Sequence, residues 1–183
     1  TGPTAPPPAA VTDLLGALAY GELTAFFRLA GDADLAPTLT AKAALAKLAA
    51  TEFSHFEALR ERLAQMGADP EVAMEPFVAA VDAFHDRTAS GDWLEGLVKA
   101  YVGDGIASDF YREISVYVDP STRELVTRVL SDSGQAEFVV ATVRAAITAD
   151  PRVGGRLALW GRRLMGEALS QAQRVAADHD GLA

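Results

Sequence analysis

The stretch that decides the fold reads Thr51-Glu52-Phe53-Ser54-His55-Phe56, a Glu-x-x-His pattern inside a long run of helix-forming residues. Residues three apart lie on the same face of an α-helix, so Glu52 and His55 point in one direction. A carboxylate and an imidazole there point into a predicted core, where burial costs free energy unless they bind a metal ion or find polar partners. The apolar residues that share this face are Leu45, Leu48, Phe56 and Leu59.

The composition favours a helical protein. Half of the 183 residues are hydrophobic, and alanine, the best helix former and a poor strand former, is abundant. The net charge of -9 argues against a broadly basic surface for nucleic acid but leaves a local patch open. The lack of cysteine excludes disulfides, thiolate catalysis and cysteine-ligated metal sites. We find no apolar run that would span a membrane and no signal-peptide pattern, and we expect a cytoplasmic protein without membrane contact.

The spacing of apolar residues and the stop signals predict a bundle of long helices. A disordered Pro/Ala-rich tail is expected over residues 1–10, followed by one helical domain over residues 11–183. A short helix lies where a crossover between two pairs of long helices would lie. The helices are expected at about 11–30 with Gly31 as the stop, 37–65, 74–87 introduced by Pro76, 93–118, 119–149 and 150–177.

Two further acids fall on the apolar faces of predicted helices. Glu22 either faces inward as a ligand or lies at the edge of its apolar stripe and pairs with an arginine. Asp104 lies between Gly103 and Gly105, and each mid-helix glycine costs about 1 kcal/mol relative to alanine. That cost indicates close helix approach, local unwinding or room for a ligand. In the alternative interpretation the glycines only allow tight packing and a tyrosine donates a hydrogen bond to Asp104.

The polar residues on these faces form a repeated pattern. Each half of the chain has one acid on one helix and an acid-x-x-ligand pair on the next, with 30 residues between the acids in the first half (52 − 22) and 28 in the second (132 − 104). This is the arrangement of a carboxylate-bridged di-metal site in a four-helix bundle, where four carboxylates offset most of the charge of two divalent ions. The six positions are Glu22, Glu52, His55, Asp104, Asp132 and Gln135.

The sequence around these six positions resembles the ferritin-like superfamily, and within it the tRNA methylthio-isopentenyladenosine hydroxylase-like (MiaE-like) family. The resemblance implies an all-α, ferritin-like four-helix bundle with a crossover helix and an extra C-terminal helix. It also implies a non-haem centre of two iron ions, or manganese in their place. Such a centre uses dioxygen and an electron donor to hydroxylate a substrate carbon, here in a tRNA. The residues that carry the resemblance are Gly21-Glu22, Thr51–Phe56, Tyr101–Gly105, Asp109–Tyr111 and Ser131–Phe138.

The resemblance also implies roles for the six positions. Glu22 and Asp104 are terminal acids, Glu52 and Asp132 bridge the two metals, and His55 is a terminal nitrogen ligand. Gln135 stands where the family has a second histidine, and its amide oxygen is a weaker ligand than imidazole. Asp132 has a simpler interpretation as the partner of Arg128 one turn earlier. These departures support an alternative function, a non-catalytic ferritin-like module that holds one metal or none.

Three arginines on the last predicted helix, Arg152, Arg156 and Arg163, are either solvated or contact RNA phosphates. His85 lies near Asp82 and Asp86 and is interpreted as a solvated surface histidine. A homodimer is among the assemblies that the sequence leaves open.

Overall fold

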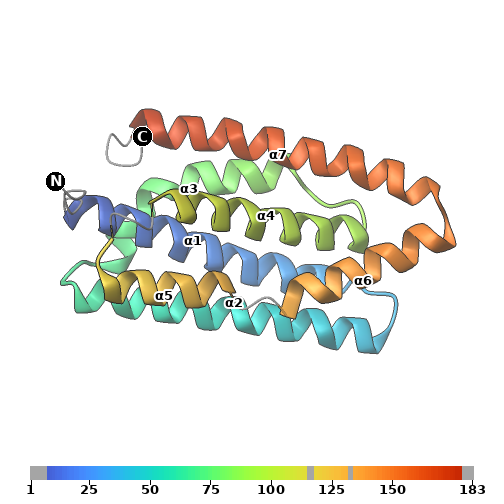
Figure 1. Ribbon diagram of the computed structural model, residues 1–183, viewed down its shortest axis with the longest axis horizontal. Coiled ribbons are helices and arrows are strands. Elements are labelled where there is room, and N and C mark those ends of the chain that lie inside the picture. The colour runs from blue at the N-terminus through green and yellow to red at the C-terminus, as the bar shows by residue number, and fades with distance from the viewer. Residues whose placement is uncertain (1–7, 115–117, 132–133, 179–183) are drawn as a thin grey trace.

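The chain folds as an all-α protein in the computed structural model (Figure 1), which describes residues 8–114, 118–131 and 134–178. These residues form seven helices and no strand, which confirms the predicted fold class. Their bounds are α1 Pro8–Ala33, α2 Leu39–Gln65, α3 Pro70–Arg87, α4 Trp93–Ile114, α5 Pro120–Ser131, α6 Gly134–Ala149 and α7 Arg152–Asp178.

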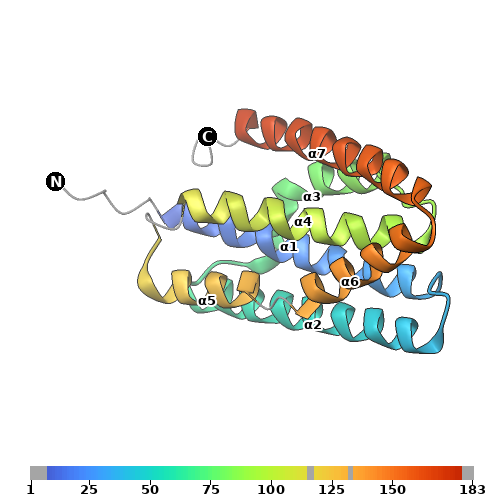
Figure 2. The same ribbon diagram turned by 45° about the vertical axis from the view of Figure 1, so that its right-hand side comes forward.

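The long helices lie side by side, with α1 at the centre in contact with α2, α3 and α4 (Figures 1 and 2). α5 and α6 follow one another along α2 and together take the place of a fourth long helix. α7 packs on α3 and α4, on the side of the bundle away from α2. α3 is therefore the crossover segment and α7 the additional C-terminal helix.

The apolar core has two clusters, one near each end of the bundle. The larger cluster includes Leu15 of α1, Leu59 and Leu63 of α2 and Val126 of α5, all fully buried. The smaller cluster joins the other ends of α1 and α2 to α4 and α6. Its buried members are Ala33, Leu45, Leu97 and Val139. The predicted ligands of α1, α2 and α4 lie between these two clusters in sequence. They are Glu22, Glu52, His55 and Asp104.

The stretch predicted as one helix over residues 119–149 contains two described helices, α5 and α6. α5 ends at Ser131 and α6 begins at Gly134, while Asp132 and Ser133 lie outside the described residues.

Two helix starts and one helix end also differ from prediction. α1 begins at Pro8, inside the stretch predicted as a tail, and continues past Gly31 to Ala33. α3 begins at Pro70 rather than near Pro76, which lies inside the helix. Asp69 explains that start, since its side chain accepts a hydrogen bond from the backbone N–H of Glu71 at 2.9 Å and Pro70 lies in the first turn.

α1 is apolar enough over Ala9–Ala33, with a mean hydropathy of 1.2, to cross a membrane by length and composition alone. The expectation that no run reaches this threshold was therefore wrong. A helix in the core of a bundle passes the same test, and α1 packs on α2, α3 and α4. Its polar members Glu22 and Asp32 also lie against other helices, so packing accounts for its hydropathy.

α1 approaches α3 closely at Gly16, where a Cβ atom would collide with the backbone carbonyl of Ala73. We expect Gly16→Ala to lower the free energy of unfolding by about 1–3 kcal/mol, because the two helices must separate. Urea denaturation would measure the change. Gly166→Ala is the matched control: Gly166 is exposed within α7 and a Cβ there meets nothing, so this variant should gain about 0.5–1 kcal/mol. Equal effects would contradict the assignment of Gly16 to helix contact.

Candidate metal centre

Glu22 of α1 meets Glu52 and His55 of α2 in the middle of the helix pair. His55 Nδ1 lies 3.6 Å from Glu22 Oε2 and 3.5 Å from Glu52 Oε2. One ligand atom from each of the three residues lies within 4.8 Å of the others, so the group could hold a metal ion. Only 13% of the Glu22, 8% of the Glu52 and 13% of the His55 side-chain surface is exposed. Of the two sequence-based interpretations of Glu22, the inward-facing one is observed.

The charges in this group depend on one another. Burial raises the pKa of Glu22 to about 8, and the neighbouring Glu52 carboxylate contributes to the rise. Burial alone would lower the pKa of His55, but the two carboxylates together raise it to about 10. Burial also acts to raise the pKa of Glu52, yet hydrogen bonds with His55 and Glu22 outweigh it and the pKa is lowered. Without a metal, the group thus retains a proton on His55 and favours one on Glu22.

The donor atoms fit a divalent transition metal. Carboxylate oxygen and imidazole nitrogen are the mixture that iron, manganese and zinc accept, and two carboxylates offset the charge of one divalent ion. The protons held on His55 and Glu22 occupy donor positions that a cation would take, and metal binding would release them. The three residues therefore suit a metal ion by chemistry and by proximity.

Asp104 of α4 lies beside this group but outside it. It lines the same cavity as Glu22 and Glu52, and the opening of that cavity leaves its side chain exposed. Surrounding protein and the negative charge of Glu52 nevertheless raise its pKa to about 7. Asp104 is placed to act on whatever occupies the cavity, and its role as a metal ligand stays a prediction.

The two glycines that flank Asp104 do not mark a close helix approach. A Cβ at Gly103 or Gly105 would meet no atom within 4 Å, and α4 continues through both without unwinding. The expectation of close approach was therefore wrong here, and of the three explanations only room for a ligand remains. Gly103 lines the cavity beside Asp104, which agrees with that explanation.

The other two predicted ligands are described only in part. Asp132 lies outside the described residues, so neither its role as a ligand nor its pairing with Arg128 is seen. Gln135 is in the first turn of α6, and its side chain lies outside the described part of the chain. Their roles in a second metal position stay predictions.

Arg156 fixes α7 to the start of α4. Its Nη1 lies 2.7 Å from Asp92 Oδ2 and 2.6 Å from Glu95 Oε1. Trp160, one turn later, donates its indole N–H to the Glu95 carbonyl at 2.9 Å. These contacts give Arg156 a structural task, and its contact with RNA stays a prediction.

Arg163 and Arg152 differ in their surroundings. Arg163 donates a hydrogen bond to the backbone carbonyl of Arg87 at 2.6 Å, at the end of α3. Arg152 is 95% exposed and lies 3.4 Å from Asp150. Arg152 therefore has a partner only two residues away, whereas Arg163 contacts another helix. Contact with RNA stays a prediction for Arg152 and Arg163.

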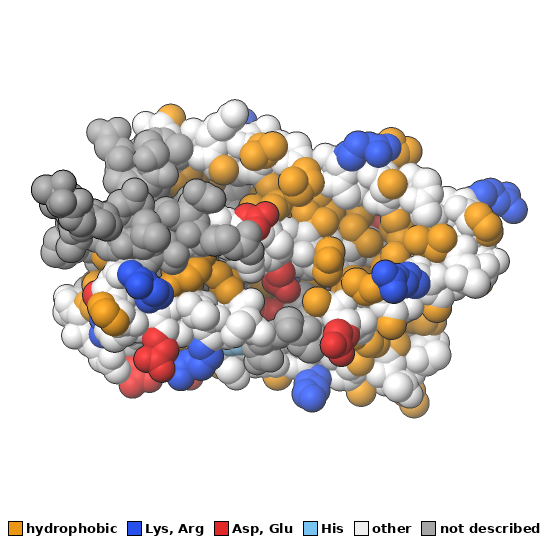
Figure 3. Space-filling view, in the orientation of Figure 1, with side chains coloured by type: hydrophobic (Ala, Val, Ile, Leu, Met, Phe, Trp, Pro, Cys, Tyr) orange, Lys and Arg blue, Asp and Glu red, His pale blue; other side chains and the backbone are white. Residues whose placement is uncertain are grey.

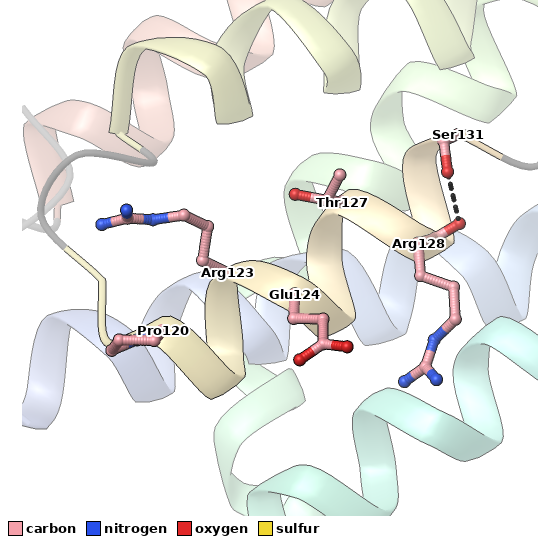
Figure 4. A pocket seen from close by; sticks show the side chains of 6 residues that line it. All are labelled: Pro120, Arg123, Glu124, Thr127, Arg128 and Ser131. Carbon is pink, nitrogen blue, oxygen red and sulfur yellow. Dashed lines mark hydrogen bonds between the residues drawn. The ribbon is translucent and has the colours of Figure 1, made fainter.

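Two hollows bear on the candidate site. The one in Figure 4, of about 480 Å³, is lined only by residues of α5 and is a shallow surface feature. The other, of about 390 Å³, lies among α1, α3, α4 and α7 and has Glu22, Glu52 and Asp104 on its wall. Figure 3 shows acidic side chains among hydrophobic ones across the centre of one face. We call the second hollow the central cavity.

His85 lines the central cavity, so its interpretation as a solvated surface histidine was wrong. Its Nδ1 is buried without a hydrogen-bond partner in the described part of the chain. Burial, together with the positive charges of Lys99 and Arg28, lowers its pKa to about 3. The acids near His85 in the sequence indicated an exposed position, whereas α7 packs on α3 in the structure.

A family model described as a ferritin-like domain of actinomycetes matches residues 8–183. The match covers all of the helices described above, including the positions of Glu22, Glu52 and His55. No curated protein matches the chain.

Proposed function

Because the chain belongs to the ferritin-like domain family of actinomycetes, we propose that it is a metal-dependent oxygenase that hydroxylates a substrate carbon. The observation that carries this proposal is the group of Glu22, Glu52 and His55, buried between α1 and α2 and bordering the central cavity. A metal held there would face a space in which a substrate can lie. Fold alone hosts many functions, so the site is what supports the proposal.

The reaction needs dioxygen and a reductant. Iron bound at this group supplies the redox chemistry that activates dioxygen. One oxygen atom enters a C–H bond of the substrate to give an alcohol. The other leaves as water with two protons and an electron pair from an external donor, such as a reduced flavoprotein or ferredoxin.

The protein residues bind, orient and exchange protons. His55 Nδ1 faces both carboxylates and releases its proton when it becomes a ligand, and Glu22 does the same. Glu52, already ionised, keeps the negative charge that attracts the cation. Asp104, with a pKa of about 7 on the cavity wall, can give or take a proton near neutral pH.

The test of this function is dioxygen uptake. The protein is loaded with ferrous iron under anaerobic conditions, and uptake is measured after dioxygen is added. We expect uptake in proportion to bound iron and at least about tenfold faster than by the same free iron, as positioned catalysis gives. His55→Ala should return uptake to the background rate, because it removes the nitrogen ligand. Glu57→Gln, an exposed change on the same helix, should behave as the unaltered protein.

A non-catalytic ferritin-like module is the second candidate. Gln135 favours it, because its amide oxygen stands where the second histidine is expected and is a weaker metal ligand than imidazole. If iron binds but uptake equals that of free iron, this second function holds and the oxygenase is excluded.

The tRNA substrate that the resemblance implies has little support in α7. Arg156 and Arg163 make contacts inside the molecule, and the net charge is -9. We therefore propose hydroxylation without tRNA as the substrate. If Arg152→Glu weakened tRNA binding in a gel-shift assay, that choice would be reversed.

A further inference from the structure

The central cavity is apolar along most of its length. Its α3 wall carries Phe77, Val81 and Phe84, and its α1 wall carries Ala25 and Leu29. The volume of about 390 Å³ lies within the range of roughly 300–1,000 Å³ that small-molecule sites occupy. Small side chains on α4 and α7 keep this space open. They are Ala100, Ala107, Ala168 and Ala172.

The positive charges that line the cavity gather at one level. Lys99 of α4 and Arg28 of α1 both line it, and each lowers the pKa of the adjacent neutral His85. Asp32 also lines this level, and burial raises its pKa while the charges of Lys99 and Arg28 act to lower it. The level as a whole therefore presents nitrogen donors to the cavity.

These donors are only partly used within the protein. Lys99 Nζ donates one hydrogen bond, to the Thr88 carbonyl at 2.7 Å, and an ammonium group has three donors. Asp32 and Asp86 act on Lys99 through their charges, but no salt bridge to Lys99 or Arg28 is seen among the described residues. A ligand with a negative charge would add a direct partner.

The metal group and this cationic level lie at different positions along the length of the cavity. Arg28 follows Glu22 by six residues (28 − 22), so it is displaced by roughly 9 Å along α1. Asp104 and Lys99 are related in a similar way on the antiparallel helix α4. The cavity continues past Glu22 to Ala17 of α1 and Ala107 of α4. The metal group therefore borders the middle of the cavity, between a cationic level and an apolar end.

We propose that the central cavity binds a single-chain amphiphile whose anionic head contacts Arg28 and Lys99. Its apolar chain then runs past Glu22 and Asp104 toward Ala17. Hydroxylation of this ligand rests on the proposed function. It would occur within the apolar chain of the amphiphile rather than next to the anionic head. Binding itself needs no metal.

Calorimetric titration of the full chain, with and without manganese, tests the proposal. The probes are decanoate, decyl phosphate, decanol and decyltrimethylammonium, each below its micelle concentration. We expect one of the two anions to bind at least about tenfold more tightly than decanol, and the cation to bind worst. Tighter binding of decanoate assigns a carboxylate head, and tighter binding of decyl phosphate assigns a phosphate head. Equal binding of all four probes, or no binding, overturns the proposal.

Variants separate the head contact from the chain contact. Arg28→Met should remove most of the preference for the anion over decanol, whereas Arg60→Met, a surface control on α2, should not. Ala168→Leu should weaken every probe by filling the cavity, and Ala158→Leu, at an exposed position of α7 outside the cavity, should not. If both Arg28→Met and Lys99→Met kept the full anion preference, the assigned head site would be wrong.

The same variants distinguish this proposal from the oxygenase itself. Arg28→Met should bind manganese as the unaltered protein does, and Glu52→Gln should still bind the anion. Anion binding without metal binding would refute the oxygenase and leave the ligand site in place. Metal-dependent dioxygen uptake without binding of any amphiphile would support the oxygenase and refute the proposed ligand site.

Discussion

Replacement of Glu52 by glutamine is expected to weaken manganese or ferrous iron binding by more than about 100-fold, since loss of a direct ligand should exceed the effect of losing an outer-shell partner. Glu52 is the most buried member of the metal group and lies 3.5 Å from His55. Glutamine keeps the size of the side chain but has no charge, and an amide oxygen is a poor metal ligand. The change therefore removes a ligand without opening a space in the core.

The matched control for Glu52→Gln is Glu57→Gln on the same helix. Glu57 is exposed and pairs with Arg60 at 2.9 Å, so its loss should leave metal affinity unchanged. Calorimetric titration of metal-free protein measures all three proteins. Equal affinity in the Glu52→Gln variant would show that any bound metal lies elsewhere.

Replacement of Glu22 by glutamine should have opposite effects on metal binding and on the stability of the metal-free protein. Metal affinity should fall by more than about tenfold, because a charged ligand becomes neutral. Metal-free protein should instead gain stability at pH 8, where the unaltered chain keeps a carboxyl group buried next to the Glu52 carboxylate. Sites that bind ligands commonly carry such a cost in stability.

The direction of this pH dependence follows from the pKa of Glu22. The folded value is about 8 and the ordinary value is 4.5, so between these the folded protein holds a proton that the unfolded chain has released. Stability from this group is present below pH 4.5 and is lost as the pH rises toward 8. Removing the group should make that decline shallower by roughly 3–4 kcal/mol between pH 5 and 8.

Urea denaturation of metal-free protein at several values between pH 5 and 8 measures the effect of Glu22→Gln. His55 also binds a proton more tightly when folded, so some decline should remain in the variant. Glu57→Gln serves again as the control and should follow the unaltered protein. Parallel curves for Glu22→Gln and the unaltered protein would mean that Glu22 is ionised in the folded state across this range.

The meeting of Glu22 with Glu52 and His55 could be anticipated from the sequence. Helical spacing places Glu52 and His55 on one face, and the apolar neighbours of Glu22 place it on the core face of α1. Two adjacent antiparallel helices then bring these positions together. Their chemistry as metal ligands remains a prediction, because proximity and burial alone do not show what binds.

The start of α3 could not be judged from apolar spacing. Pro76 was predicted to lie in the first turn, whereas Asp69 caps the helix and Pro70 occupies its first turn. Element boundaries depend on such short-range hydrogen bonds, which the period of a helix does not reveal.

The central cavity was missed for a different reason. It exists because small residues from four helices face one another, and a single helix pattern shows only one of those faces. Arg28, Lys99 and His85 lie far apart in the sequence, and no spacing rule connects them. The glycines beside Asp104 are the sequence feature that indicates this open space, since a Cβ at Gly103 would meet no atom within 4 Å.

The claim that Glu22, Glu52 and His55 form a metal site is tested most directly by anomalous diffraction from crystals grown with manganese or iron. We predict an anomalous peak within bonding distance of all three side chains, with the peak lost in crystals of Glu52→Gln. Crystals that carry the metal only at other positions, or that show no anomalous signal between α1 and α2, would contradict the claim.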